Sequence, residues 1–149
     1  MRPAWMLVPL LLVACSQSTH ASSGAEATVH IRVAEGSVTV HASVSDTHAA
    51  RERGLAGRTD LAPDGGMAFL FDHQVRASFW MKDTLIPLSI AFWGPRGRIV
   101  SIMDMPPCRS DPCPSFRPAV PYTGALEVNL GFFSRNGVEV GDRIDLSRR

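Results

Sequence analysis

The sequence from about residue 28 onward is divided into many short segments rich in β-branched and aromatic residues, each followed by a turn signal. In residues 28–44, apolar and polar side chains alternate on both sides of a Glu-Gly-Ser turn at residues 35–37, which predicts a β-hairpin. Six further segments of this kind follow, at residues 67–72, 75–81, 88–94, 98–105, 124–130 and 142–146. Short strands at near-regular spacing predict a mainly β fold, a compact antiparallel barrel or sandwich.

One short helix is expected between the hairpin and the later strands. Asp46 is a suitable N-cap, the helix would run through Arg53, and Gly54 would end it in the left-handed conformation. The sequences GPRG, at residues 94–97, and RNG, at residues 135–137, are turn signals. We therefore expect a single helix of about two turns on an otherwise β framework.

The N-terminus has the pattern of an export signal. Arg2 precedes an apolar stretch that is too short to span a bilayer, since a transmembrane helix needs about 20 apolar residues. Residues 1–14 therefore predict a signal peptide. Residues 12–15, LVAC, resemble the lipobox of bacterial lipoproteins, in which Cys15 becomes the acylated N-terminus. Several acyl chains would anchor the protein stably in a membrane. A plain signal peptide cut further along is the alternative.

The chain after the signal divides into a tether and one domain. Residues 15–27 comprise the lipid-anchored cysteine and a flexible tether of small and polar residues, and residues 28–149 have the length of a single domain, which we expect to be a monomer. Ser16 follows the cysteine, as is usual in lipoproteins sorted to the outer membrane. We therefore expect an exported protein attached to the outer membrane and facing the periplasm.

The charge balance argues against a nucleic-acid partner. Loss of Arg2 with the signal lowers the count of Lys and Arg from 15 to 14, which equals the 14 Asp and Glu. A formal charge of about zero gives no long-range field that would steer nucleic acid to the surface.

The three cysteines are accounted for by lipidation and one disulfide. Lipidation would use Cys15, and Cys108 would pair with Cys113 across a short loop flanked by prolines. On the chain-entropy model so small a ring contributes only about 2 kcal/mol, so its role would be to hold a surface loop. A redox or metal-binding pair is the alternative, although the spacing is not CxxC.

Several sequence blocks resemble one family. They are RERGLAGR, GGMAFLF, FWMKDTLIPLSIAF, RGRIVSI, the CRSDPCP loop, and ALEVNLG with VEVGDRI, spread in order over residues 51–144. Together they are similar to the domain of unknown function 192 (DUF192) family. The resemblance implies a small, mainly β, exported or membrane-tethered bacterial domain with no assigned activity.

Two positions depart from the pattern of that family. Asp83 stands where the family usually has asparagine, and Ser89 stands where it usually has aspartate. A serine near neutral pH cannot replace an obligatory acid, base or hard-cation ligand, but it can accept a hydrogen bond from a backbone amide. We therefore expect a structural role at position 89, with Asp83 as a possible substitute acid.

The candidate ligand-binding residues are polar or aromatic side chains from three blocks: Arg51, Arg53, Trp80, Lys82, Asp83 and Glu127. Lys82, Asp83 and Glu127 could form a buried polar cluster that binds a ligand or transfers a proton. The alternatives are a surface ion pair for the charged residues and a core position for Trp80, as for Trp93. No nucleophile elbow or phosphate-binding loop is present, so no catalytic residue is assigned.

Three classes of function are compatible with these features. We expect a noncatalytic binding or interaction domain at the cell envelope, without a cofactor and with an unidentified envelope ligand or protein as its partner. The first alternative is an enzyme that uses the cluster of Lys82, Asp83 and Glu127. The second is a copper-binding protein that uses Met103 and Met105, because thioethers suit cuprous copper, although methionines on one strand face are more often core residues.

Overall fold

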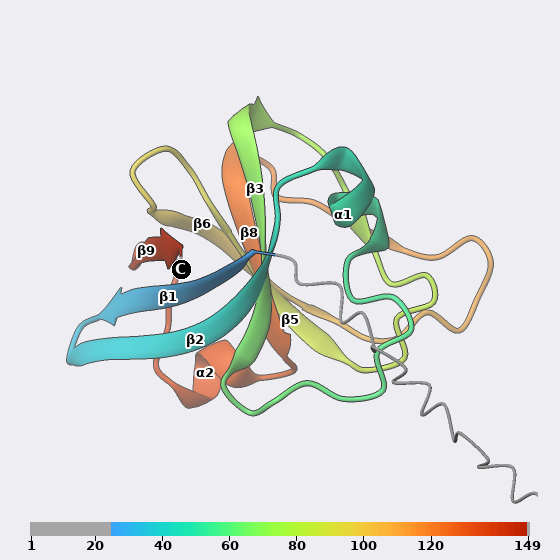
Figure 1. The fold of residues 1–149 in the computed structure, drawn as a ribbon, viewed down its shortest axis with the longest axis horizontal. Helices are drawn as coiled ribbons and strands as arrows, with labels where there is room; N and C mark the ends of the chain where they lie inside the picture. The colour runs from blue at the N-terminus through green and yellow to red at the C-terminus, as the bar shows by residue number, and fades with distance from the viewer. Residues whose placement is uncertain (1–24, 149) are drawn as a thin grey trace, which may run out of the picture.

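The computed structural model describes residues 25–148, which form nine strands and two short helices (Figure 1). The elements are β1 (Glu26–Val33), β2 (Gly36–Ser45), α1 (His48–Arg53), β3 (Gly65–Val75), β4 (Phe79–Trp80), β5 (Leu88–Trp93), β6 (Ile99–Met105), β7 (Ser115–Phe116), β8 (Tyr122–Asn129), α2 (Phe132–Arg135) and β9 (Arg143–Arg148). The predicted signal peptide and Cys15 lie outside the described residues. Within residues 25–148, neither helix has the length and hydropathy needed to cross a membrane.

Seven strands form one sheet in the order β6-β5-β8-β3-β2-β1-β9, and β4 and β7 form a separate pair. The expected hairpin is confirmed as β1 and β2, with the turn at residues 34–35. Every neighbouring pair in the large sheet is antiparallel except β2 and β3, which are parallel. A parallel pair needs a crossover connection, and α1 lies in that connection.

The two edge strands of the sheet approach each other at one point. An isolated bridge joins Arg98 to Arg143, and the amide of Ile144 donates to the carbonyl of Gly97 at 2.8 Å. Figure 1 shows the resulting strong curl of the sheet. The mainly β class is confirmed, but the sheet is not closed into a continuous barrel.

The curled sheet separates two groups of buried side chains. One contains Val29, Val40, Trp93 and the phenylalanines of α2. The other contains residues of β3, β5 and β8 and includes Leu55, Met67, Phe69, Met81, Leu88, Ile90, Phe92, Met105, Tyr122 and Ala125. The second group lies under α1 and β4, and it forms the base on which the candidate site is built.

Three details of the helices differ from the sequence prediction. The expectation of a single helix is wrong, because Phe132 and Phe133 lie in α2 and are buried. The N-cap of α1 is Thr47 rather than Asp46, since the Thr47 hydroxyl accepts from the Ala50 amide at 3.2 Å. Gly54 ends α1 at φ 49° and ψ −135°, so its φ is positive but its conformation is not left-handed helical.

Candidate functional site

A cavity of about 260 Å³ lies between α1 and the chain segment that contains β4. Its lining comes from α1 and the two residues that follow it, from residues within the segment 77–84, from two phenylalanines of β3, and from one residue of β8. We call it the α1–β4 cavity. Five of the six sequence-predicted residues line it, namely Arg51, Arg53, Trp80, Lys82 and Glu127.

Glu127 forms the floor of the α1–β4 cavity. On β8 it lies opposite Met67 of β3 and Ile90 of β5, so it is placed among apolar side chains on the side that faces the cavity. Only 5% of the residue is exposed, and burial raises the pKa of Glu127 from 4.5 to about 8. No hydrogen-bonding or ionic partner for this carboxyl is found within residues 25–148. Its oxygens are not among the fully buried side-chain atoms that lack a partner, so the carboxyl opens onto the cavity, and its raised pKa keeps it mostly protonated at neutral pH.

Arg51 is held in the wall of the cavity by the backbone of neighbouring elements. Its Nη1 donates to the carbonyl oxygens of Asp46, at 2.6 Å, and Leu70, at 2.9 Å. Its guanidinium also lies 4.9 Å from the centre of the Phe71 ring. These contacts restrict the side chain, so the charge of Arg51 is fixed in place before any ligand enters.

The outer part of the cavity carries further positive charge and an exposed tryptophan. Arg53 and Lys82 are both exposed, and the Lys82 Nζ lies 5.5 Å from the centre of the Trp80 ring. Trp80 is 57% exposed. It is therefore available to a ligand, whereas Trp93 is buried against Gly124 in the other core group.

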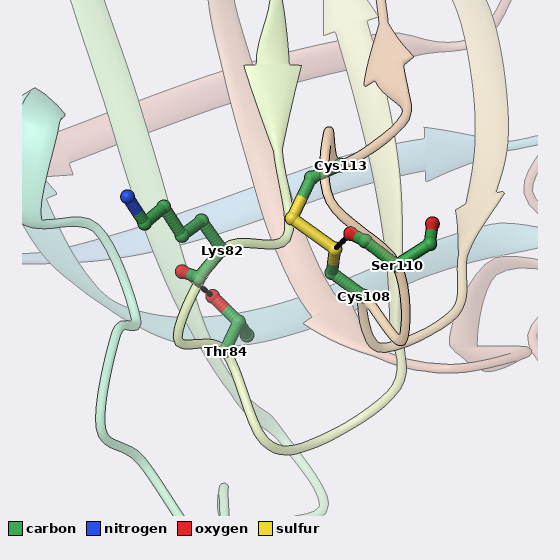
Figure 2. The surroundings of a disulfide bond; sticks show 5 residues. All are labelled: Lys82, Thr84, Cys108, Ser110 and Cys113. Atoms are coloured by element: carbon green, nitrogen blue, oxygen red, sulfur yellow. Dashed lines mark hydrogen bonds between the residues drawn. A yellow bond between two sulfur atoms is a disulfide. The ribbon is translucent and has the colours of Figure 1, made fainter.

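The wall that contains Trp80 is held by a short strand pair and a disulfide. Phe79 and Trp80 in β4 pair with Phe116 and Ser115 in β7. The predicted disulfide between Cys108 and Cys113 is confirmed, and Figure 2 shows Lys82 and Thr84 in its surroundings.

Tyr122 fixes the start of the same wall. Its hydroxyl donates to the Ala77 carbonyl at 2.9 Å, and burial raises the pKa of Tyr122 to about 12 while Arg117 lowers it by a smaller amount. The sequence prediction missed both β7 and the role of Tyr122. A strand of two residues has no periodicity to detect, and a tyrosine at the start of an apolar segment looks like an ordinary core residue.

Asp83 does not line the cavity. It has a φ of 58°, and its carbonyl accepts from the Gly57 amide at 2.9 Å. Asparagine and aspartate adopt positive φ more readily than other residues with a side chain, which explains either residue at this turn. The cluster of Lys82, Asp83 and Glu127 is therefore not assembled: Lys82 and Glu127 share the cavity and Asp83 lies outside it.

Ser89 has a structural environment. It is buried on β5, it donates to Asp104 Oδ1 at 2.5 Å, and it accepts from the Gly131 amide at 2.8 Å. The expected hydrogen bond from a backbone amide is thus confirmed. The acid beside Ser89 is Asp104 on the neighbouring strand, not Asp83.

The two methionines of the copper hypothesis belong to the core. Met105 is completely buried, Met103 packs against the same group, and Cys108 is bridged to Cys113. In the part of the chain that the structure describes, no group of three or more His, Cys, Asp or Glu side chains is arranged to hold a metal ion. The geometry therefore gives the copper hypothesis no support.

The fold and the cavity define a small, mainly β protein with room for a small organic molecule. The chain belongs to the DUF192 family, described as "Uncharacterized ACR", whose family model matches residues 29–146. This confirms the resemblance seen in the sequence. No curated protein matches the chain.

The chain is similar to solved structures, two of which share just over 30% of their residues with it. The first is a proposed transcription regulator from Sinorhizobium meliloti, with 32% identity and a TM-score of 0.77 over 83% of this chain and 95% of that chain. The second is a protein of unknown function from Novosphingobium aromaticivorans, with 31% identity and a TM-score of 0.74 over 79% of this chain and 83% of that chain.

Proposed function

We propose that this protein is an exported lipoprotein whose domain binds a small ligand, without catalysis, in the α1–β4 cavity. The observation that carries the proposal is Glu127, a buried carboxyl with no protein partner that faces a cavity. Its oxygens open onto the cavity, so a ligand that enters can hydrogen-bond to the carboxyl, and the apolar surroundings would strengthen that bond relative to one in water. Convergence of charged and aromatic side chains on the same cavity supports a binding site.

The proposed location rests on the N-terminal sequence and on the disulfide. Cys15 in its lipobox would attach the protein to the outer membrane, facing the periplasm. The bridge between Cys108 and Cys113 supports an oxidising compartment. Incorporation of labelled palmitate into the protein, and its loss in Cys15→Ser, tests this part. Label in the Cys15→Ser variant would contradict it.

An enzyme is the second candidate, and Glu127 is the observation that favours it. A carboxyl whose pKa is about 8 holds a proton that it can donate near neutral pH, as a general acid does. Among the residues that line the cavity, no nucleophile is hydrogen-bonded to a base, and Asp83 lies outside the cavity. Binding without catalysis therefore needs fewer assumptions than an enzymatic reaction. Turnover of any bound compound that is lost in Glu127→Gln would favour the enzyme.

A role in nucleic-acid binding is not part of the proposal. The Sinorhizobium meliloti protein is described as a regulator, but that description applies to that protein. The mature chain proposed here has a formal charge of about zero, which favours a small-molecule ligand over a polyanion.

The binding proposal can be tested with a library of small metabolites. Thermal stabilisation of the purified protein would identify ligands, since binding to the folded state raises the unfolding temperature. Ala77→Trp adds a large side chain to the cavity wall and is expected to abolish the response, whereas Ala49→Trp changes a residue of α1 that does not line the cavity and is expected to preserve it. Equal responses of the two variants would refute binding in this cavity.

A further inference from the structure

The two ends of the α1–β4 cavity differ in charge. Three cations lie in the wall and at the mouth, Arg51, Arg53 and Lys82. The only acid among the exposed lining residues is Glu52, whose Oε2 lies 3.4 Å from His48 Nδ1. The mouth therefore has an excess of positive charge.

The floor, in contrast, is uncharged at neutral pH. The groups opposite Glu127 are Met67 on β3 and Ile90 on β5, and β5 contains no titratable residue. The ionisable residues of β3, Asp72 and His73, are exposed and do not line the cavity. The charged groups that face Glu127 across the cavity are therefore those already named on α1, together with Lys82. The ion pairs found among residues 25–148 do not include Glu127, so none of these cations lies within 4.0 Å of its carboxyl oxygens.

The apolar part of the lining is largely aromatic and is formed by Leu55, Phe69, Phe71, Phe79 and Trp80. The rings of Phe69 and Phe79 are in edge contact, with centroids 4.9 Å apart, so this surface is packed and preformed. A flat apolar body would bury its surface here without disturbing the protein.

We propose that the α1–β4 cavity binds a small organic acid with an aromatic or apolar body, whose anionic group meets Lys82 and Arg53 and whose far end presents a hydroxyl or carbonyl to Glu127. This inference rests on the proposed binding function and adds the chemical class of the ligand. The volume of about 260 Å³ lies below the range usual for drug-sized ligands, which favours a molecule of about one ring.

Ionisation of Glu127 should make the affinity for the ligand depend on pH. Protonated Glu127 can donate to a carbonyl or accept from a hydroxyl, and it carries no charge that would repel the acid. Above a pH of about 8 the carboxylate forms, and it repels an organic anion. Affinity for the acid is therefore expected to fall as the pH rises through about 8, and Glu127→Gln is expected to remove that fall.

The test uses four probes that share one ring, measured by calorimetric titration of the purified protein. They are 4-hydroxyphenylacetate, 4-hydroxyphenethyl alcohol, tyramine and phenylacetate. The first should bind about tenfold more tightly than the alcohol and more tightly still than the amine, because only the acid gains charge-assisted hydrogen bonds. Phenylacetate should bind about tenfold more weakly than its hydroxylated form, because it leaves Glu127 without a partner.

Variants separate the mouth from the floor. Lys82→Gln should weaken 4-hydroxyphenylacetate about tenfold and leave the alcohol unchanged, since the lost contact is electrostatic. Arg109→Gln removes an exposed cation that does not line the cavity, and it should change neither. Tightest binding of tyramine, or equal weakening of acid and alcohol by Lys82→Gln, would overturn the inference. If none of the four probes binds, the inference about the chemical class of the ligand is overturned as well. In that case the proposed binding function stands only if a compound of the metabolite library binds in the cavity, and it is refuted if no compound does.

Discussion

Replacement of Glu127 by glutamine should make the stability of this protein less dependent on pH. The native state keeps the Glu127 proton up to a pH of about 8, whereas the unfolded chain releases it near 4.5. Between these two values the native state binds more protons than the unfolded state, so the free energy of unfolding falls as the pH rises. Below about 4.5 both states are protonated and above about 8 both are ionised, so this contribution is constant outside that window.

The size of the effect follows from the same two values. Each tenfold change in proton affinity corresponds to about 1.4 kcal/mol, so a rise in pKa from 4.5 to about 8 corresponds to about 5 kcal/mol across the window. At pH 7 the loss is about 3 kcal/mol. Glutamine has nearly the same shape and no charge to desolvate. Glu127→Gln should therefore be more stable than the wild type by about 3 kcal/mol at neutral pH and similar to it below pH 4.5.

The assay is urea denaturation of both proteins across this pH window, with the difference between their free energies of unfolding plotted against pH. All other ionisable groups are the same in the two proteins, so their contributions cancel in the difference. Glu35→Gln is the matched control, because the Glu35 side chain is exposed in the turn between β1 and β2 and its replacement should leave the free energy of unfolding close to that of the wild type across the window. A flat difference for Glu127→Gln, or a Glu127 carboxyl that titrates near 4.5 by NMR, would refute the reasoning.

Two further predictions concern the frame around the cavity. Gly97→Ala should destabilise the protein by more than about 2 kcal/mol in urea denaturation, because a Cβ there would lie 2.1 Å from the Ile144 carbonyl oxygen at the junction of the sheet edges. Gly137→Ala is the control, since Gly137 has a similar positive φ but lies in open space; equal losses of stability in the two variants would contradict the predicted clash. Replacing Cys108 and Cys113 together by serine should lower the free energy of unfolding by about 2 kcal/mol, and it should reduce thermal stabilisation by ligands, because the bridge supports the wall that contains Trp80. If neither the free energy of unfolding nor the stabilisation by ligands changes, the loop is held without the bridge.

The sequence was most informative where a pattern repeats or where residue type alone restricts the outcome. Alternation in residues 28–44 predicted the hairpin of β1 and β2, because a strand with one buried face must alternate. The spacing of Cys108 and Cys113 predicted their disulfide. The parallel pairing of β2 with β3 was not predictable, since period-2 alternation is the same whether the neighbouring strand runs parallel or antiparallel.

The sequence suggested candidate residues but not how they are arranged. Trp80, Lys82 and Glu127 are candidates because they are polar or aromatic residues in otherwise apolar blocks, whereas Arg51 and Arg53 come from a polar segment. The structure places these five residues in the lining of one cavity. Asp83 was selected by the same criterion, and the structure gives it a turn position outside the cavity instead. Asp83 follows Lys82 directly in the sequence, but this does not place both side chains in the cavity, because a positive φ changes the direction of the chain within one residue.

The mainly β class, the family and the short-range disulfide follow from the amino-acid sequence, because each depends on local composition or on residues close together along the chain. The burial and charge state of Glu127 depend instead on how distant elements pack. Its alternation with Leu126 and Val128 places it on the opposite face of β8 but does not say whether that face meets water or protein. The packing of α1 and β4 over that face encloses the carboxyl, and burial then changes its charge. That property arises from elements about 50 to 80 residues away along the chain, so no local pattern could contain it.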